Sequence, residues 1–170
     1  MKLNNKREGP HENMTADEVD AYLRRHEKIP SFLEIRESPG KGLGVFATED
    51  INDTTQSTSY LGIYLGEYMG KHYSKQHAEE LEKRDYLMHI ITDGVSYGYT
   101  DAQDISESNW TRFINDGAHP NCTDYVMGYF KPKRFFVAIF ADKDIKKGEE
   151  LIMHYGGNYW EHDTSSSFKE

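Results

Sequence analysis

The stretch from residue 109 to residue 122, Asn-Trp-Thr-Arg-Phe-Ile-Asn-Asp-Gly-Ala-His-Pro-Asn-Cys, constrains the fold of this chain more than any other. Its apolar side chains require burial, yet Arg112 and Asn115 carry hydrogen-bonding groups that a buried site has to satisfy. Gly117 and Pro120 interrupt any regular helix or strand in this region. The combination is typical of a segment that holds a ligand, and a structural turn with satisfied polar groups is the alternative.

Three further segments extend the pattern. Residues 40–47 are Gly-Lys-Gly-Leu-Gly-Val-Phe-Ala, residues 64–67 are Tyr-Leu-Gly-Glu, and residues 148–155 are Gly-Glu-Glu-Leu-Ile-Met-His-Tyr. The opening stretch resembles the Arg-Phe-(Ile/Leu)-Asn-His-Ser-Cys-x-Pro-Asn signature of SET-domain protein-lysine methyltransferases. The other three segments resemble further motifs of that family, in the expected order. The resemblance runs from about Phe32 to Trp160, which is most of the chain.

This resemblance implies a SET fold, which is mainly β with short helices. Small curved β-sheets surround a pseudoknot formed by the two C-terminal motifs. Residues 31–160 are then a SET-like catalytic domain, preceded by a flexible segment and helix over residues 1–30 and followed by a polar tail at residues 161–170. A length of 170 residues is that of one domain.

Local patterns predict the individual elements. Thr15 and Glu18 have the spacing of a capping box that begins a helix, and Pro30 ends it. Residues 134–140 are nearly all apolar, as expected for a strand buried on both faces. Asp93 and Gly94 separate two strands and predict a hairpin. The other strands are expected over residues 33–37, 45–47, 86–92, 95–100, 125–129 and 150–155, with short helices over residues 74–83 and 106–113.

The charge of the chain bears on its partners. The net charge is −9 and the isoelectric point about 5.4. Such a surface repels phosphates, so we expect no direct binding of nucleic acid. It suits a basic, lysine-containing protein such as a histone tail. The alternative is that the acidity only keeps the domain soluble.

Cysteine and histidine usage argues against a metal site. The single cysteine, Cys122, excludes an intrachain disulfide and a cysteine-rich zinc site of the kind that follows many SET domains. The eight histidines show no tight ligand spacing. No run of 18 apolar residues or hydrophobic signal region is present, so we expect no membrane association and an intracellular protein, nuclear if its substrate is chromatin.

The resemblance implies S-adenosylmethionine as the cofactor. The glycine loop corresponds to a loop that contacts the methionine part of the cofactor, although an ordinary hairpin turn is the alternative. Trp160 is a candidate to stack on the adenine, or it only plugs the edge of the core. By this resemblance the cofactor-binding residues are Lys41, Gly42, Leu43, Gly44, Arg112, Phe113, Asn115, Asp116 through its main chain, and Trp160.

Methyl transfer to lysine requires a neutral amine, although the unperturbed pKa of lysine is about 10.4. Tyrosines suit such a channel because their rings attract cations and their hydroxyls orient an amine. The resemblance assigns the catalytic role to Tyr155, with Tyr64 as the second candidate. Tyr60 begins a near repeat of the same segment and is the alternative register. Any of these tyrosines could instead be a core residue with a satisfied hydroxyl.

Two residues are expected in the substrate channel. Met153 stands where the family often has Phe or Tyr, and its flexible side chain leaves room for an amine that already carries a methyl group. We therefore expect methylation beyond the first step. Tyr125 follows the opening stretch closely enough to reach the same space from the neighbouring strand, which would limit that room.

The chain also departs from the family pattern. Asp116, Gly117 and Ala118 replace His-Ser-Cys, and His154 replaces an Asp before the final tyrosine. The matching motifs and these departures leave two functions to consider. The first is methyl transfer from S-adenosylmethionine to lysine side chains of a basic protein. The alternative is a catalytically weak SET-like module that binds a basic protein, which the replaced residues favour.

Overall fold

A computed structural model describes residues 13–155 of the chain. Strands form most of its regular structure, and its helices are few and short, as predicted. The elements in chain order are α1 (Ala16–His26), β1 (Leu33–Ser38), β2 (Gly42–Ala47), β3 (Ile63–Tyr68), β4 (Lys71–Tyr73), α2 (Lys75–Glu79), β5 (Leu87–Thr92), β6 (Val95–Asp101), the 3₁₀ helix η1 (Trp110–Phe113), β7 (Asn115–Asp116), β8 (Cys122–Phe130), β9 (Lys133–Ala141) and β10 (Ile152–Met153).

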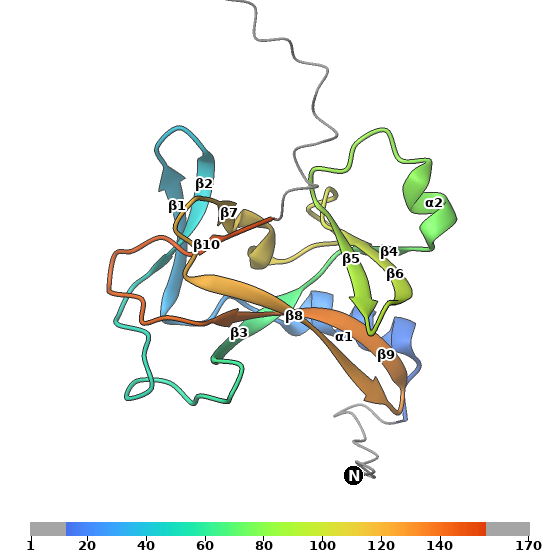
Figure 1. Ribbon diagram of the computed structural model, residues 1–170, viewed down its shortest axis with the longest axis horizontal. Helices are drawn as coiled ribbons and strands as arrows, with labels where there is room; N and C mark the ends of the chain where they lie inside the picture. Colours follow the sequence, from blue (N-terminus) through green and yellow to red (C-terminus); the bar gives the residue numbers. More distant parts are fainter. Residues whose placement is uncertain (1–12, 156–170) are drawn as a thin grey trace, which may run out of the picture.

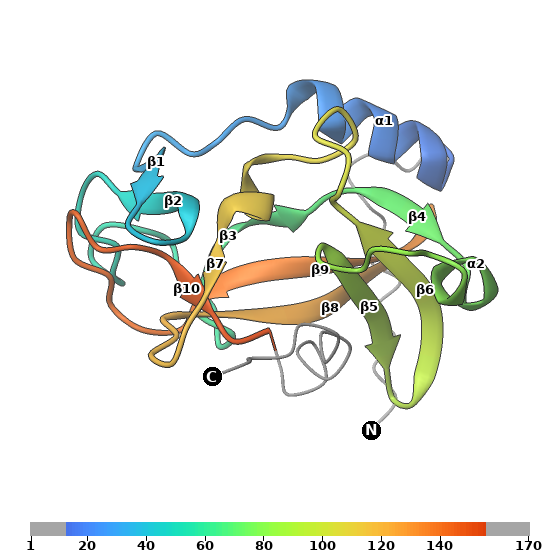
Figure 2. The same cartoon turned by 90° about the horizontal axis from the view of Figure 1, so that it is seen from above.

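The strands form small separate sheets rather than one large one. The antiparallel sheet β3–β9–β8 crosses the middle of the molecule, with the β1–β2 hairpin at one end and the sheet β4–β6–β5 at the other (Figures 1 and 2). A parallel pair, β7 with β10, lies beside the β1–β2 hairpin. This arrangement confirms the predicted architecture of small sheets.

Strand β9 is the central element of the core. It pairs with β3 on one side and β8 on the other, and its side chains alternate between two hydrophobic clusters. The prediction of a strand buried on both faces is therefore confirmed. Val137, Ile139 and Ala141 face the main core, and Phe136, Ala138 and Phe140 face a second, smaller cluster.

The predicted hairpin is present, and two of the predicted helices are shorter than expected. The β5–β6 hairpin turns at Asp93 and Gly94, whose φ angles of 52° and 75° are those of a tight turn with two left-handed residues. Helix α1 begins with the predicted capping box but ends at His26, because Glu27 adopts an extended conformation and its carboxylate accepts a bond from the Glu67 amide at 3.4 Å. The predicted helix over residues 106–113 is a single 3₁₀ turn.

An ion cluster that the sequence analysis did not predict fixes α1 to the sheet. Asp20 of α1, Glu67 of β3 and Arg134 of β9 are all buried. Arg134 Nε donates to Asp20 Oδ1 at 2.7 Å, and its Nη1 donates to Glu67 Oε2 at 3.0 Å, while Nη2 contacts both carboxylates. One guanidinium thus joins three elements that are distant in sequence.

This cluster predicts a pH dependence of stability. Burial raises the pKa of Glu67 from its ordinary value of 4.5 to about 7, and the carboxylates of Glu27 and Asp20 act in the same direction against Arg134. Between these two values the folded state holds the proton more tightly than the unfolded chain. The free energy of unfolding should therefore fall as pH rises through this window.

Urea denaturation at a series of pH values checks this expectation. Glu67→Gln should show a shallower fall between about pH 5 and pH 7 than the wild type, because that variant no longer titrates. The comparison isolates Glu67 from Glu27, whose pKa burial also raises. Identical slopes in the two proteins would contradict the assignment.

Candidate active site

The parallel pair β7–β10 brings two of the sequence motifs together. Asn115 lies opposite Ile152, and Asp116 lies opposite Met153. Gly117 N donates to the Met153 carbonyl at 3.0 Å and continues the pairing. The two segments are therefore neighbours, as the resemblance implied. Threading of one of them through a loop, the predicted pseudoknot, stays a prediction.

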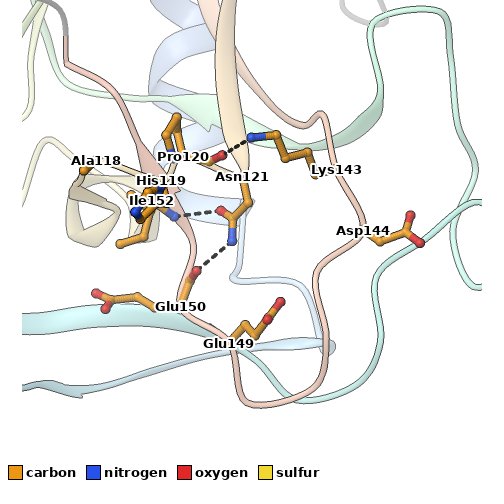
Figure 3. Close-up of a pocket in the computed structure, with 9 residues that line it drawn as sticks. All are labelled: Ala118, His119, Pro120, Asn121, Lys143, Asp144, Glu149, Glu150 and Ile152. Carbon is orange, nitrogen blue, oxygen red and sulfur yellow. Dashed lines mark hydrogen bonds between the residues drawn. The ribbon is translucent and has the colours of Figure 1, made fainter.

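Side-chain hydrogen bonds of Asn121 hold the segment of residues 148–155 in place. Its Oδ1 accepts from Ile152 N at 2.8 Å, and its Nδ2 donates to the Glu150 carbonyl at 2.9 Å (Figure 3). These bonds replace strand pairing, which explains why β10 is shorter than the predicted strand over residues 150–155. A hollow of about 490 Å³ lies at this point, but none of the predicted site residues lines it.

A second cavity, of about 530 Å³, collects most of the predicted site residues. Its volume is within the usual range for small-ligand pockets. Gly44 does not line it, and Trp160 is outside the described residues. The lining consists of Lys41, Gly42, Leu43, Asp85, Tyr86, Arg112, Phe113, Asn115, Asp116 and Tyr155. Of these, only Asp85 and Tyr86 were absent from the sequence-based set.

Hydrogen bonds hold the Asn115 side chain on the cavity wall and connect it to β2, to Glu150 and, through Glu150, to β1. Its Nδ2 donates to the Leu43 carbonyl at 3.1 Å and to Glu150 Oε1 at 2.7 Å. Ser38 Oγ donates to the other Glu150 oxygen at 3.0 Å. A Cβ on Gly44 would lie 2.3 Å from Glu150 Oε1, so Gly44 makes room for this clamp instead of contacting a ligand.

Arg112 also lines the cavity and contacts two of its aromatic residues. Its Nε donates to the Ala102 carbonyl at 2.9 Å. Its guanidinium lies 4.5 Å from the ring centre of Tyr86 and 5.0 Å from that of Phe113. The cation therefore holds two aromatic rings in place beside the cavity.

Tyr155 lines the cavity and is held at both ends. Its hydroxyl donates to the Ile114 carbonyl, and its main-chain N donates to Asp116 Oδ1 at 2.8 Å. Lys41 Nζ donates to the Asp116 carbonyl at 2.9 Å, which ties the glycine loop to the same residue. The last motif, the opening stretch and the glycine loop thus meet at Asp116.

The structure does not bring Tyr64 and Tyr125 to this cavity. Both pack edge-on against Phe140, a member of the second hydrophobic cluster, with ring centres 5.6 and 5.7 Å away. Strand alternation and the β3 bulge after Tyr64 put them on the face of the sheet opposite Tyr155. Tyr60 is 97% exposed. Neither register considered from sequence therefore reaches the site, and Tyr125 does not compete for space near Met153.

Met153 and Tyr68 are on the Tyr155 side of the sheet. Met153 is buried in the main core and does not line the cavity. The expected methylation beyond the first step stays a prediction. Tyr68 begins a third Tyr-x-Gly segment, four residues after Tyr64, which the sequence analysis missed. Its hydroxyl donates at 2.9 Å to the carbonyl of Tyr86, a cavity residue.

We expect Tyr68→Phe to weaken the cavity wall. The Tyr86 carbonyl loses a partly buried hydrogen bond, which typically costs about 1 kcal/mol. Ligand affinity should fall a few-fold in titration calorimetry. The exposed Tyr60→Phe is the matched control. Equal affinities for the two variants would remove Tyr68 from the site.

Comparison with known proteins agrees with this geometry. The SET domain family model matches residues 42–156, a range that includes all the cavity residues except Lys41. This chain belongs to the SET-domain family of protein-lysine methyltransferases.

Several curated proteins resemble this SET domain. A variant-silencing SET domain-containing protein of Plasmodium falciparum is 30% identical over 75% of the chain. Histone-lysine N-methyltransferases of Aspergillus oryzae, H3 lysine-36 specific, and Schizosaccharomyces pombe, H3 lysine-4 specific, are 32% and 30% identical over 68% and 66% of the chain. The matched region spans only 5%, 11% and 11% of these relatives, respectively.

Among residues 13–155, no group of three or more His, Cys, Asp or Glu side chains is arranged to hold a metal ion. No helix among the same residues is long and apolar enough to cross a membrane.

Proposed function

We propose that this SET domain transfers methyl groups from S-adenosylmethionine to lysine side chains of a basic protein. The observation that carries the proposal is the convergence of three separate motifs on one cavity. The glycine loop, the opening stretch and Tyr155 all line it, although more than 100 residues separate the first from the last.

The chemistry of the cavity fits this cofactor. Lys41 offers a cation for a carboxylate, and Asp85 offers an acceptor for an ammonium group or hydroxyls. The rings of Tyr86 and Phe113 suit stacking with an aromatic base. When bound, S-adenosylmethionine would supply a methyl group that leaves its sulfur for the amine nitrogen, while the nitrogen loses one proton.

The role of Tyr155 follows from its hydrogen bonds. Because its hydroxyl proton points to the Ile114 carbonyl, the phenol oxygen meets a substrate amine as an acceptor. Accepting an N–H from the amine directs the nitrogen lone pair elsewhere, and a fixed phenol can direct it towards the methyl group. A half-buried site also favours the neutral form of the amine over the charged form.

A histone tail is the proposed substrate. Named relatives act on lysines of histone H3, and the net charge of −9 favours a lysine-rich partner. A chromatin substrate would make the protein nuclear. The assay is calorimetric titration with S-adenosylmethionine, followed by transfer of labelled methyl groups to mixed histones. Binding without transfer would favour the alternative of a catalytically weak SET-like module.

Asn115→Ala tests the cofactor site directly. We expect it to weaken S-adenosylmethionine binding by about 1 kcal/mol, because Leu43 and Glu150 lose a shared donor at a partly exposed site. Calorimetry measures the change, and Asn13→Ala, at an exposed site outside the cavity, is the matched control. Unchanged affinity in Asn115→Ala would exclude this cavity as the cofactor site.

A further inference from the structure

We propose that Asp116 is a positioning residue for Tyr155, and that His154 is its partner in this task. The inference rests on the proposed function, since it concerns how Tyr155 is aimed. It assigns a role to the Asp116 side chain, whereas the resemblance to the family assigned only its main chain to the cofactor.

The geometry points to Asp116 as the fixed point of the last motif. Strand β10 ends at Met153, two residues before Tyr155. Asp116 Oδ1 accepts a hydrogen bond from Tyr155 N at 2.8 Å, which connects the end of the last motif to β7. The carboxylate therefore fixes where the Tyr155 Cα lies, and the Ile114 carbonyl fixes where its ring ends.

Lys41 and His154 hold Asp116 from two sides. Lys41 Nζ donates to its carbonyl at 2.9 Å, and His154 Nδ1 lies 3.8 Å from its Oδ1. The His154 contact is within ion-pair range when the imidazole is protonated, although its side chain is 65% exposed. An exposed pair of this kind contributes little on its own. The hydrogen bond to Tyr155 is thus the main element, and His154 restrains the carboxylate that accepts it.

Two of the departures from the family pattern amount to an exchange of one acid and one histidine between two positions. The chain has Asp116 where the signature has His, and His154 where the last motif has Asp. The structure puts the two side chains 3.8 Å apart, with Asp116 in β7 and His154 directly after β10. An acid and an imidazole are therefore both kept, in exchanged order. Replacing only one of them would leave two carboxylates or two imidazoles at this contact.

A readout independent of activity is fluorine NMR of protein labelled with 3-fluorotyrosine. The Tyr155 resonance is identified by its loss in Tyr155→Phe. We expect it to move in Asp116→Ala and to stay at its wild-type position in Asp116→Asn, whose amide oxygen still accepts from the Tyr155 amide. Asp53→Ala, at an exposed site, is the control. An unmoved resonance in Asp116→Ala would overturn the proposal.

Turnover and cofactor affinity complete the test. Turnover in Asp116→Ala should fall roughly five- to tenfold below that in Asp116→Asn, the expected effect of one hydrogen bond, with similar cofactor affinity. Equal turnover in the two variants would overturn the positioning role. The exchange D116H/H154D should exceed both D116H and H154D, and a double variant no better than D116H would remove His154. If the wild type transfers no methyl group, the proposed function fails, while the fluorine spectra still decide the positioning role.

Discussion

Tyr155→Phe should lose roughly 100-fold in turnover on a lysine peptide, while its affinity for S-adenosylmethionine changes little. Loss of one well-placed transition-state hydrogen bond typically has an effect of this size. The phenol oxygen is the group expected to accept from the amine, and the phenylalanine ring still fills the same space in the cavity wall. The loss should appear in single-turnover rates as well as in steady state, because the missing contact acts on the chemical step.

Folding has to be measured alongside turnover. The Tyr155 hydroxyl also donates to the carbonyl of Ile114, which is buried, so the variant should unfold at a lower temperature. Turnover should therefore be compared at a temperature where both proteins are folded, with Tyr60→Phe as the control. Near-normal turnover in Tyr155→Phe would move the catalytic role to another tyrosine, and Tyr68 would be the first to examine.

The cavity residues could be predicted because they are local features of the chain. The glycine loop and the stretch from residue 109 to residue 122 bring their own turn chemistry, and a motif match carries each residue in register. The β9 strand was equally predictable, since an uninterrupted apolar run has few other places in a domain. Asp85 and Tyr86 also line the cavity, but no motif marked them, because they enter from the start of a separate sheet.

The tyrosines of both expected registers lie away from the cavity for a geometric reason. Tyr60, Tyr64 and Tyr68 recur every four residues, so three Tyr-x-Gly segments match almost equally well. In a regular strand, residues four apart face the same side, which would put Tyr64 and Tyr68 together. The bulge after Tyr64 breaks that alternation and separates them onto opposite faces of the sheet. A bulge depends on pairing with β9, and single-sequence patterns do not contain it.

The ion cluster was missed because its members are far apart in sequence. The Arg134 to Asp20 bond spans 114 residues, and the bond to Glu67 spans 67. Two weak signals existed in the sequence. Asp20 lies beside Val19 on the apolar side of α1, and Arg134 has the same strand parity as Phe136, which is buried. Charged residues at such positions indicate buried partners, because unpaired buried charges are very costly.

Arg134→Met should destabilise the fold by about 3–5 kcal/mol, the usual effect of removing one partner from a buried ion pair. The variant keeps an apolar stem of similar length but leaves the Asp20 and Glu67 carboxylates without their cation. Such a loss approaches the whole stability of many single domains, which is about 5–15 kcal/mol. Because the guanidinium joins α1, β3 and β9, the helix should detach as the sheet weakens.

Urea denaturation near neutral pH measures this change, and Lys146→Met is the matched control. Lys146 forms an exposed pair with Asp50 at 3.3 Å, so its loss should cost less than about 1 kcal/mol. A similar cost for both variants would contradict the buried cluster. The variant R134M/E67Q/D20N, which also neutralises both buried carboxyl groups, distinguishes two causes of the loss. If stability recovers in it, the cost in Arg134→Met came from the buried carboxyl groups left without their cation, since buried ion pairs often contribute little net stability when all partners are replaced. If it does not recover, the bonds that Arg134 makes between the three elements are themselves what holds α1 on the sheet.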